Sequence, residues 1–361
     1  MIKNIGWTLG NDCPCKCKHC YSFTVRKKGQ MKQSYYLYKS GRLQRKDNTL
    51  EIVYKDNSKK VIPVERVEDI YVMTEFDFNT ALLNFLSQYG IKVHFFNYYG
   101  FYTGTYYPKE TLVSGKLLIK QVEHYIDNVK RVKIAKAFID SASYNIHRNL
   151  VYYKNRGKDL EEYIKEIEYL RNQIDNCKDV NELMGIEGNI RKIYYSSWNE
   201  IINQDIKFEK RVKNPPDNAI NSLISYVNTI IYTRVLSEIY KTQLNPTISY
   251  LHEPSERRFS LCLDIAEIFK PLIGDRLIFS MLNKKQITEK DFEKGLNFLY
   301  IKDKPRMEIT KEIDKRLQTT IKHKKLDREV SYEYLIRLEV YKLIKYLLGD
   351  GESYEGFKIW W

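Results

Sequence analysis

The chain has 361 residues, and its 60 lysine and arginine residues outnumber its 46 aspartate and glutamate residues, which gives a formal net charge of +14. This length allows two compact units, and the positive charge favours a polyanionic partner such as a nucleic acid. Because no stretch reaches the roughly 18 apolar residues of a membrane helix and residues 1–12 lack the apolar core of a signal peptide, we exclude a membrane protein and expect a cytoplasmic one.

A cluster of cysteines marks residues 1–30 as a separate, cysteine-rich extension. Cys13, Cys17 and Cys20 have the CxxxCxxC spacing, which resembles the motif with which radical S-adenosylmethionine enzymes bind a [4Fe–4S] cluster. A radical enzyme also needs a barrel that binds its cofactor, and the sequence changes character at Met31. We therefore do not expect radical catalysis from this segment.

Three interpretations of these cysteines stay open. The extension is vestigial, with Met31 as the original start, or it binds an iron–sulfur cluster or Zn²⁺ with Cys15 or His19 completing the shell, or it forms a disulfide. The clustered thiols, together with the isolated Cys177 and Cys262, favour a reducing cytoplasm.

Residues 31–112 predict a β-rich domain. Short runs rich in tyrosine and β-branched residues are separated by turn sequences, which is the pattern of a strand-rich domain. We expect strands at 35–38, 49–54, 59–64 and 92–96, and one short helix at 79–88.

The pattern becomes helical after residue 112. Amphipathic stretches predict helices at 115–145, 160–176, 180–205, 217–243 and 330–348. The sequence thus predicts an α+β fold, with the β-rich domain followed by a larger all-α domain at 113–348. A tail at 349–361 begins with a linker, and its aromatic end either packs on the helical domain or docks a partner.

Glu187 is the first candidate for chemistry, because the helical period places it on an apolar stripe. That stripe contains Leu183, Ile190, Tyr194 and Ile201. Burying a carboxylate there costs several kcal/mol unless a cation or metal compensates its charge. Gly185 and Gly188 flank Glu187 and leave room for a ligand near the backbone. The alternative is an ordinary ion pair with Arg191, four residues later.

A second group of candidates follows in residues 251–267. Asp264 and Glu267 lie side by side on the flank of a predicted helix, and His252 lies just upstream. A histidine with two or three carboxylates suits Mg²⁺ or Mn²⁺ better than structural zinc. The alternatives are a structural histidine and a solvated helix edge that carries the two acids.

Basic residues accompany both groups. Lys210, Arg211 and Lys213 precede a Pro-Pro-Asp-Asn sequence, and Arg257 and Arg258 stand between His252 and the two acids. Their position predicts contacts with phosphates of DNA, which position a duplex without reading its bases.

Three motifs together resemble a known family. They are Gly-Ile-Glu-Gly at 185–188, Pro-Pro-Asp-Asn-Ala-Ile-Asn at 215–221 and Leu-His-Glu-Pro-Ser-Glu-Arg-Arg-Phe-Ser-Leu at 251–261. In order and separation they resemble the CRISPR-associated spacer-acquisition integrase, the first protein of the CRISPR adaptation module. The resemblance extends from about residue 31 to near the C-terminus.

The resemblance implies roles for individual residues. It implies that Glu187, His252 and Glu267 bind a catalytic Mg²⁺ or Mn²⁺, and that Asp264 supports the site by orienting a ligand or helping as a base. Positioning, rather than chemistry, is implied for the asparagines at 218 and 221 in the second motif.

The resemblance also implies activity and partners. Family members are metal-dependent DNA endonucleases and integrases that join the 3′-hydroxyl ends of captured DNA to a CRISPR repeat. The implied partners are double-stranded DNA, a second copy that dimerises through the β-rich domain, and a small ferredoxin-like protein, the second member of the module. A stand-alone nuclease specific for branched DNA and a non-catalytic DNA-binding scaffold stay open as alternatives.

Overall fold

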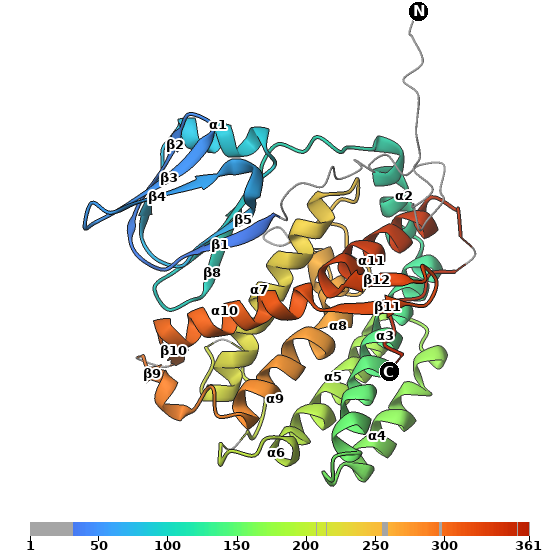
Figure 1. The fold of residues 1–361 in the computed structure, drawn as a ribbon. Coiled ribbons are helices and arrows are strands. Elements are labelled where there is room, and N and C mark those ends of the chain that lie inside the picture. The colour runs from blue at the N-terminus through green and yellow to red at the C-terminus, as the bar shows by residue number, and fades with distance from the viewer. Residues whose placement is uncertain are drawn as a thin grey trace, which may run out of the picture.

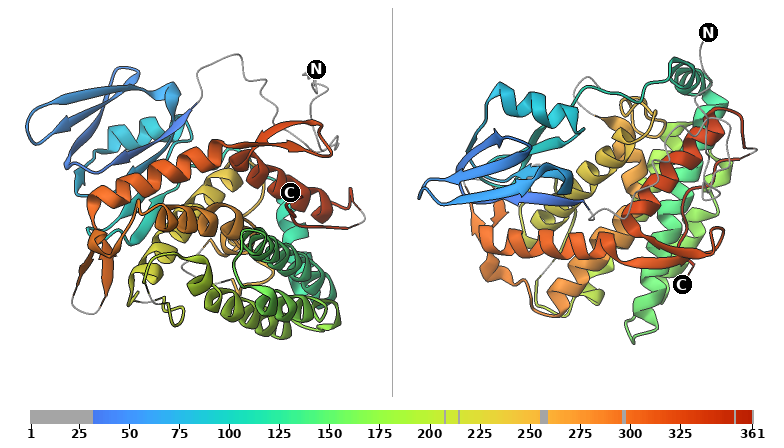
Figure 2. Two further views of the ribbon diagram at one scale, coloured as in Figure 1. Left: turned by 60° about the horizontal axis from the view of Figure 1, so that its bottom comes forward. Right: turned by 45° about the horizontal axis from the view of Figure 1, so that its top comes forward.

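The computed structural model describes residues 32–206, 208–213, 215–254, 259–295, 298–351 and 353–360. A strand-rich part built from the first third of the chain stands beside a larger helical part (Figure 1 and Figure 2). This is the predicted α+β fold. The predictions for Cys13, Cys17 and Cys20 lie outside the described residues.

Two four-stranded sheets form the β-rich part. The first has the order β1 (Gln33–Leu37), β5 (Val67–Val72), β7 (Lys92–Phe96) and β8 (Tyr102–Tyr106). The second has the order β4 (Lys59–Pro63), β3 (Thr49–Tyr54), β2 (Gly41–Lys46) and β6 (Phe76–Asp77). In the first sheet β1, β5 and β7 are parallel and β8 is antiparallel to β7.

The helix α1 (Thr80–Gln88) closes the core between these strands. Its N-cap is Asn79, whose side-chain oxygen accepts a hydrogen bond from the amide of Leu82 at 2.9 Å. Apolar side chains of α1 and of both sheets pack into one cluster, separate from the core of the helical part. The predicted strand at 92–96 and helix at 79–88 therefore lie where the sequence placed them.

Ten α-helices and one π-helical turn, together with two short 3₁₀ turns and two hairpins, form the helical part among the described residues. The helices and the π-helical turn are α2 (Gly115–Ile126), α3 (Asn128–Lys154), α4 (Glu161–Arg171), α5 (Val180–Ser196), α6 (Trp198–Ile201), α7 (Ala219–Tyr240), α8 (Ser260–Lys270), the π-helical turn Pro271–Asp275, α9 (Arg276–Asn283), α10 (Asp303–Gln318) and α11 (Tyr332–Leu347). The hairpins are β9 (Phe292–Lys294) with β10 (Leu299–Ile301), and β11 (Thr320–His323) with β12 (Arg328–Ser331).

Two predicted helices are interrupted in the structure. The stretch 115–145 divides at Asp127, which leaves helical geometry, caps α3 through its side chain, and lets α3 continue to Lys154. The stretch 180–205 divides at Ser197, where α5 gives way to the short α6. At Asp127 a local capping side chain thus overrides a continuous apolar period. Ser197 makes no such capping hydrogen bond.

Helix α7 is the central element of the molecule (Figure 1), and most of its residues are buried. It contacts the first sheet through Thr233, whose hydroxyl lies 3.2 Å from that of Tyr71. Its Arg234 donates to Tyr36 of β1 at 2.7 Å and pairs with Asp314 of α10. The β-rich and helical parts are therefore joined by buried polar pairs and by Tyr71 and Phe96 of the first sheet, which belong to the apolar core of the helical part.

The tail packs on the helical part. Tyr354 donates to Glu339 of α11 at 2.6 Å, and Asn145 of α3 bonds the backbone of Phe357 and of Ile359. Gly356 lies so close to Ser141 that an added Cβ would stand 2.3 Å from the serine hydroxyl. Of the two alternatives for the tail, packing is the one observed. Among the described residues, no helix has the length and apolar character needed to cross a bilayer.

A buried histidine at the junction of the two parts makes the fold sensitive to acid. His94 of β7 is fully buried, with Nδ1 2.8 Å from the Thr105 hydroxyl and Nε2 3.4 Å from that of Ser237. Burial lowers the pKa of His94 to about 3, although the negative charge of Asp69 opposes this shift. The unfolded chain therefore takes up a proton at this residue below pH 6.5, and the native state does not.

We expect His94→Gln to flatten this acid dependence. Because His94 has a depressed pKa, its contribution to stability is complete above the unfolded value and is lost as pH falls toward the folded one. Between pH 7 and pH 5 the wild-type chain should lose about 2 kcal/mol more unfolding free energy than the variant. Urea denaturation at the two values measures this, with His124→Gln as control. Equal losses in wild type and His94→Gln would contradict the assignment.

Candidate active site

Helix α5 carries Glu187 at the border of its buried face. The stripe residues Leu183, Ile190 and Tyr194 are buried, whereas the Glu187 side chain is 23% exposed. The acid thus faces a hollow rather than the core. An added Cβ at either flanking glycine would meet no protein atom within 4 Å. The backbone around Glu187 is therefore open to a ligand.

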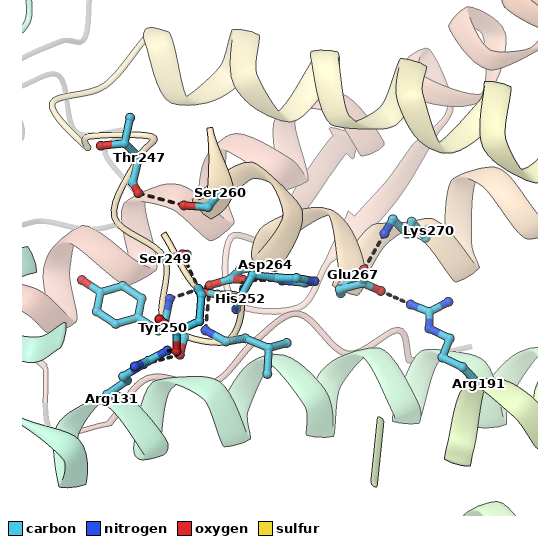
Figure 3. Close-up of polar contacts among 12 residues, drawn as sticks. Arg131, Arg191, Thr247, Ser249, Tyr250, His252, Ser260, Asp264, Glu267 and Lys270 are labelled. Carbon is cyan, nitrogen blue, oxygen red and sulfur yellow. Dashed lines mark hydrogen bonds and ion pairs between the residues drawn. The ribbon is translucent and has the colours of Figure 1, made fainter. Parts of the chain in front are cut away.

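The alternative ion pair is present as well. Arg191 Nε donates to Glu187 Oε1 at 3.0 Å, the contact expected four residues along a helix. Sequence spacing gave no sign that this guanidinium also donates, through Nη2, to Glu267 of α8 (Figure 3). Arg191 therefore bridges two acids that are far apart in the sequence.

Asp264 is the fixed centre of the second group. Its buried carboxylate accepts hydrogen bonds from the backbone amides of Tyr250, Leu251 and His252 at 2.7–3.0 Å. It also lies 2.8 Å from Nδ1 of the His252 ring (Figure 3). One side chain thus shapes the backbone that carries His252 and orients its imidazole.

The orientation of His252 leaves its other ring nitrogen for a ligand. In the neutral ring, donation from Nδ1 to Asp264 places the lone pair on Nε2. Burial by itself lowers the pKa of His252, but the hydrogen bond and charge of Asp264, with a further contribution from Glu267, raise the pKa above its usual value. Figure 3 shows the imidazole between Asp264 and Glu267.

Glu267 is held by cations. Its side chain is only 9% exposed and pairs with both Arg191 and Lys270. Burial opposes ionisation, yet Arg191, Lys270 and His252 together hold the pKa of Glu267 well below its usual range. Since Asp264 and Glu267 are both buried, the solvated-edge interpretation of these acids is wrong.

Two hollows meet at Glu267. The first has a volume of about 440 Å³ and contains Glu187 and Arg191, and the second, of about 700 Å³, contains His252. Residues that line both are Arg211, Lys213, Asn228, Glu267 and Lys270. The acid and histidine that lie 65 residues apart in the sequence are thereby placed on either side of one shared carboxylate.

Among the described residues, the predicted DNA-binding residues fall into two groups. The lysines are exposed at the hollows, whereas Arg211 is bonded to helix α7. Lys210 and Lys213 are exposed at the first hollow, and Lys213 also reaches the second. Partial desolvation and the charge of Lys270 lower the pKa of Lys213, which indicates crowded cations. Arg211 donates to Asn221 at 3.1 Å and to the Ser225 hydroxyl at 2.9 Å, at the start of α7.

Two of these predictions receive no placement. Arg257 and Arg258 lie outside the described residues, and their contact with phosphates stays a prediction. Arg211 is engaged with the first turns of α7, so any contact it makes with DNA has to share its donors with that helix.

Asp275, which had not been singled out from the sequence, is a third acid whose charge acts on Arg191. Asp275 ends the π-helical turn after α8 and is 1% exposed. Burial raises the pKa of Asp275 to about 7, against the charge of Arg191 and a hydrogen bond with Tyr194. Its Oδ2 atom has no hydrogen-bond partner among the described residues.

The π-helical turn is fixed from three directions. Asn149 of α3 donates to the carbonyl of Pro271 at 2.7 Å, and Arg316 of α10 donates to that of Leu272 at 2.8 Å. Gly274 approaches α7 so closely that an added Cβ would stand 2.9 Å from Ile231. Such turns occur often at functional sites, and this one holds Asp275 in place.

The donor set fits a hard divalent ion in type. One imidazole nitrogen and two carboxylates border adjoining hollows, and the imidazole has its supporting acid. Among the described residues, however, no three acidic, histidine or cysteine side chains are close enough together to hold an ion as they stand. Two of the candidate ligands, Glu187 and Glu267, are instead bridged by Arg191.

Comparison with known proteins agrees with this arrangement. The profile of the family described as "CRISPR associated protein Cas1" matches residues 35–315. The CRISPR-associated endonuclease Cas1 of Fusobacterium nucleatum is 60% identical over 331 residues, which cover 92% of this chain and 98% of that relative. A solved CAS1 protein from Thermotoga maritima is 42% identical, with a TM-score of 0.80 over 90% of this chain and 100% of its own.

A more distant structure shares the fold alone. A casposase bound to integration product superposes with a TM-score of 0.79 at 19% identity, covering 90% of this chain and 92% of its own. The architecture described above thus extends to proteins with little sequence in common with this one.

We expect Asp264→Asn to destabilise the chain by about 3 kcal/mol, because the amide loses the charge and one acceptor that three backbone amides and an imidazole share. Urea denaturation at pH 7 measures the loss. The matched control is Asp140→Asn, since the side chain of Asp140 is 38% exposed and pairs only with other side chains. A loss for Asp264→Asn no larger than the control would contradict this role.

Proposed function

This chain belongs to the family of CRISPR-associated protein Cas1, and on that premise we propose that it is a divalent-metal-dependent DNA endonuclease and integrase. It inserts captured foreign DNA into a CRISPR array by attack of a 3′-hydroxyl on a phosphodiester of the repeat. The observation that carries this proposal is the position of Glu267, which borders both the hollow of Glu187 and that of His252.

We propose Glu187, His252 and Glu267 as the ligands of Mg²⁺ or Mn²⁺. An ion at these residues would neutralise charge at the phosphodiester and stabilise the leaving oxygen. Asp264 supports the site by keeping the proton on Nδ1 of His252, which leaves Nε2 of this lining residue of the second hollow as the acceptor. The roles of all four residues are proposals drawn from family membership and from this local chemistry.

The chain's own cations suit an anionic substrate. Lys213 and Lys270 border both hollows, and Lys210 borders the first. Ammonium groups there attract phosphate oxygens without reading bases, so that binding depends on the ends and shape of the DNA. Nuclease and integrase differ only in the attacking oxygen, which comes from water in one case and from a DNA 3′ end in the other.

We further propose that the active assembly contains a second copy of this chain, joined through the β-rich domain, and the ferredoxin-like second protein of the adaptation module. Solved structures that share this fold include a complex titled "Cas6-RT-Cas1--Cas2 complex", at 18% identity. Both partners are carried over from the family and not from contacts of this chain.

Removing a proposed ligand should abolish joining of DNA ends without unfolding the chain. We expect Glu187→Gln and His252→Ala to lower the strand-transfer rate at least about a hundredfold, since even residues supporting metal ligands have effects of this size. The assay is strand transfer into supercoiled repeat DNA with Mn²⁺, together with the second protein of the module.

Glu166→Gln is the matched control, because Glu166 is an exposed acid on the neighbouring α4. Wild-type rates for Glu187→Gln would overturn the ligand assignment. Cleavage without joining by the wild-type chain would replace the integrase by the structure-specific nuclease, and DNA binding unaffected by metal and by loss of Glu187 would indicate the scaffold.

Replacing a lysine that borders the hollows should weaken DNA binding only through the loss of its positive charge. We expect Lys213→Ala to lower affinity uniformly across duplex sequences and to reduce the slope of log affinity against log salt by about 1. Fluorescence anisotropy with a labelled duplex at several salt concentrations measures both. Lys311→Ala, an exposed lysine of α10, is the control, and equal slopes for the two variants would contradict the prediction.

A further inference from the structure

Three acidic side chains surround Arg191, and only two of them are in contact with it. Glu187 and Glu267 accept hydrogen bonds from its guanidinium. The third is Asp275, and Arg191 is the strongest of the positive charges that act on it. Conversely, the acids that act on Arg191 include Glu267, Glu187 and Asp275. Arg191 therefore contacts two carboxylates and lies within range of the charge of a third.

The unused oxygen of Asp275 requires an explanation. A buried polar atom without a partner costs about 1–3 kcal/mol, and such atoms are few in native proteins. Among the described residues Oδ2 of Asp275 is one of them, although the turn that carries it is held by Asn149, Arg316 and the close approach of Gly274. The acid is thus kept in position with one acceptor vacant.

An ion at the proposed metal site would leave the Arg191 guanidinium in need of another acceptor. A divalent cation held by Glu187 and Glu267 would repel the guanidinium that now occupies both carboxylates, since like charges about 4 Å apart repel by several kcal/mol at a protein surface. Lys270 would also be displaced from Glu267, but it borders both hollows and could turn toward a bound phosphate. The Arg191 side chain is only 13% exposed and needs an acceptor inside the protein.

We propose that Arg191 is an exchangeable counter-ion, which bridges Glu187 and Glu267 in the metal-free protein and moves its guanidinium to Asp275 when a divalent ion binds. Asp275 is then a positioning residue that receives the displaced charge. The inference rests on the proposed metal site and adds to it a defined exchange of cations. It explains both the bridge seen here and the vacant acceptor.

The test is a double-substitution cycle in which Mn²⁺ affinity, and not activity, is the readout. Electron paramagnetic resonance of free Mn²⁺ gives the dissociation constant for the full chain without DNA. We expect Arg191→Met to bind Mn²⁺ at least about tenfold more tightly, because the competing cation is gone. Asp275→Asn should bind about tenfold more weakly, because the displaced guanidinium has no carboxylate to receive it.

The decisive comparison is Asp275→Asn in the Arg191→Met background. With no guanidinium left to relocate, the effect of Asp275→Asn should fall below about twofold. If Asp275 acted through its own charge on the ion or through packing, its substitution would weaken binding by the same factor in both backgrounds, and this result would overturn the inference.

A second measurement guards against misfolding. The rise in thermal midpoint caused by Mn²⁺ reports affinity even in a less stable variant, and it should be larger than wild type in Arg191→Met and smaller in Asp275→Asn. Absence of Mn²⁺ binding to the wild-type chain would overturn the proposed metal site together with this inference. Binding that Glu187→Gln abolishes but Asp275→Asn leaves unchanged would overturn the inference alone.

Discussion

Carboxylates gathered in a protein interior persist only where donors or cations compensate their charge. In this site the compensation takes two forms. Asp264 is satisfied by an imidazole and by three backbone amides, and the amides cannot leave without rearranging the segment that carries His252. Glu187 and Glu267 are satisfied only by the side chains of Arg191 and Lys270. The acid held by backbone amides shapes the site, and the acids held by side chains are those proposed to bind the ion.

Helix α7 connects the site with the β-rich part of the fold. Its first turn is tied to Arg211, its Asn228 borders both hollows, and further along Thr233 and Arg234 contact the β-rich part. Because one buried helix carries all of these contacts, the hollows keep a fixed position relative to the sheets. A β-rich part that dimerises would thereby set the distance between two such sites.

The sequence predicted the fold class and the candidate acids, because their signals are local. The period of 3.6 residues and the short β-rich runs need no knowledge of tertiary contacts. The pairing of Arg191 with Glu267 bridges 76 residues of sequence, and the burial of Asp264 depends on a loop 12 to 14 residues upstream. Asp275 was missed because only the packing of a π-helical turn against α3, α7 and α10 distinguishes it from an ordinary helical acid.

Compensation of the charges of Glu187 and Glu267 connects binding of the proposed metal with binding of the proposed substrate. In the metal-free protein Arg191 and Lys270 are neutralised by the acids that they contact, so they offer little attraction to a phosphate. A divalent ion at Glu187 and Glu267 would take over those acids, and Lys270 would then face the hollows without a carboxylate partner. In that case affinity for the phosphodiester would rise, and by thermodynamic reciprocity bound DNA would raise the affinity for the ion by the same factor. The proposed metal and DNA would thus bind cooperatively because they share one set of counter-ions.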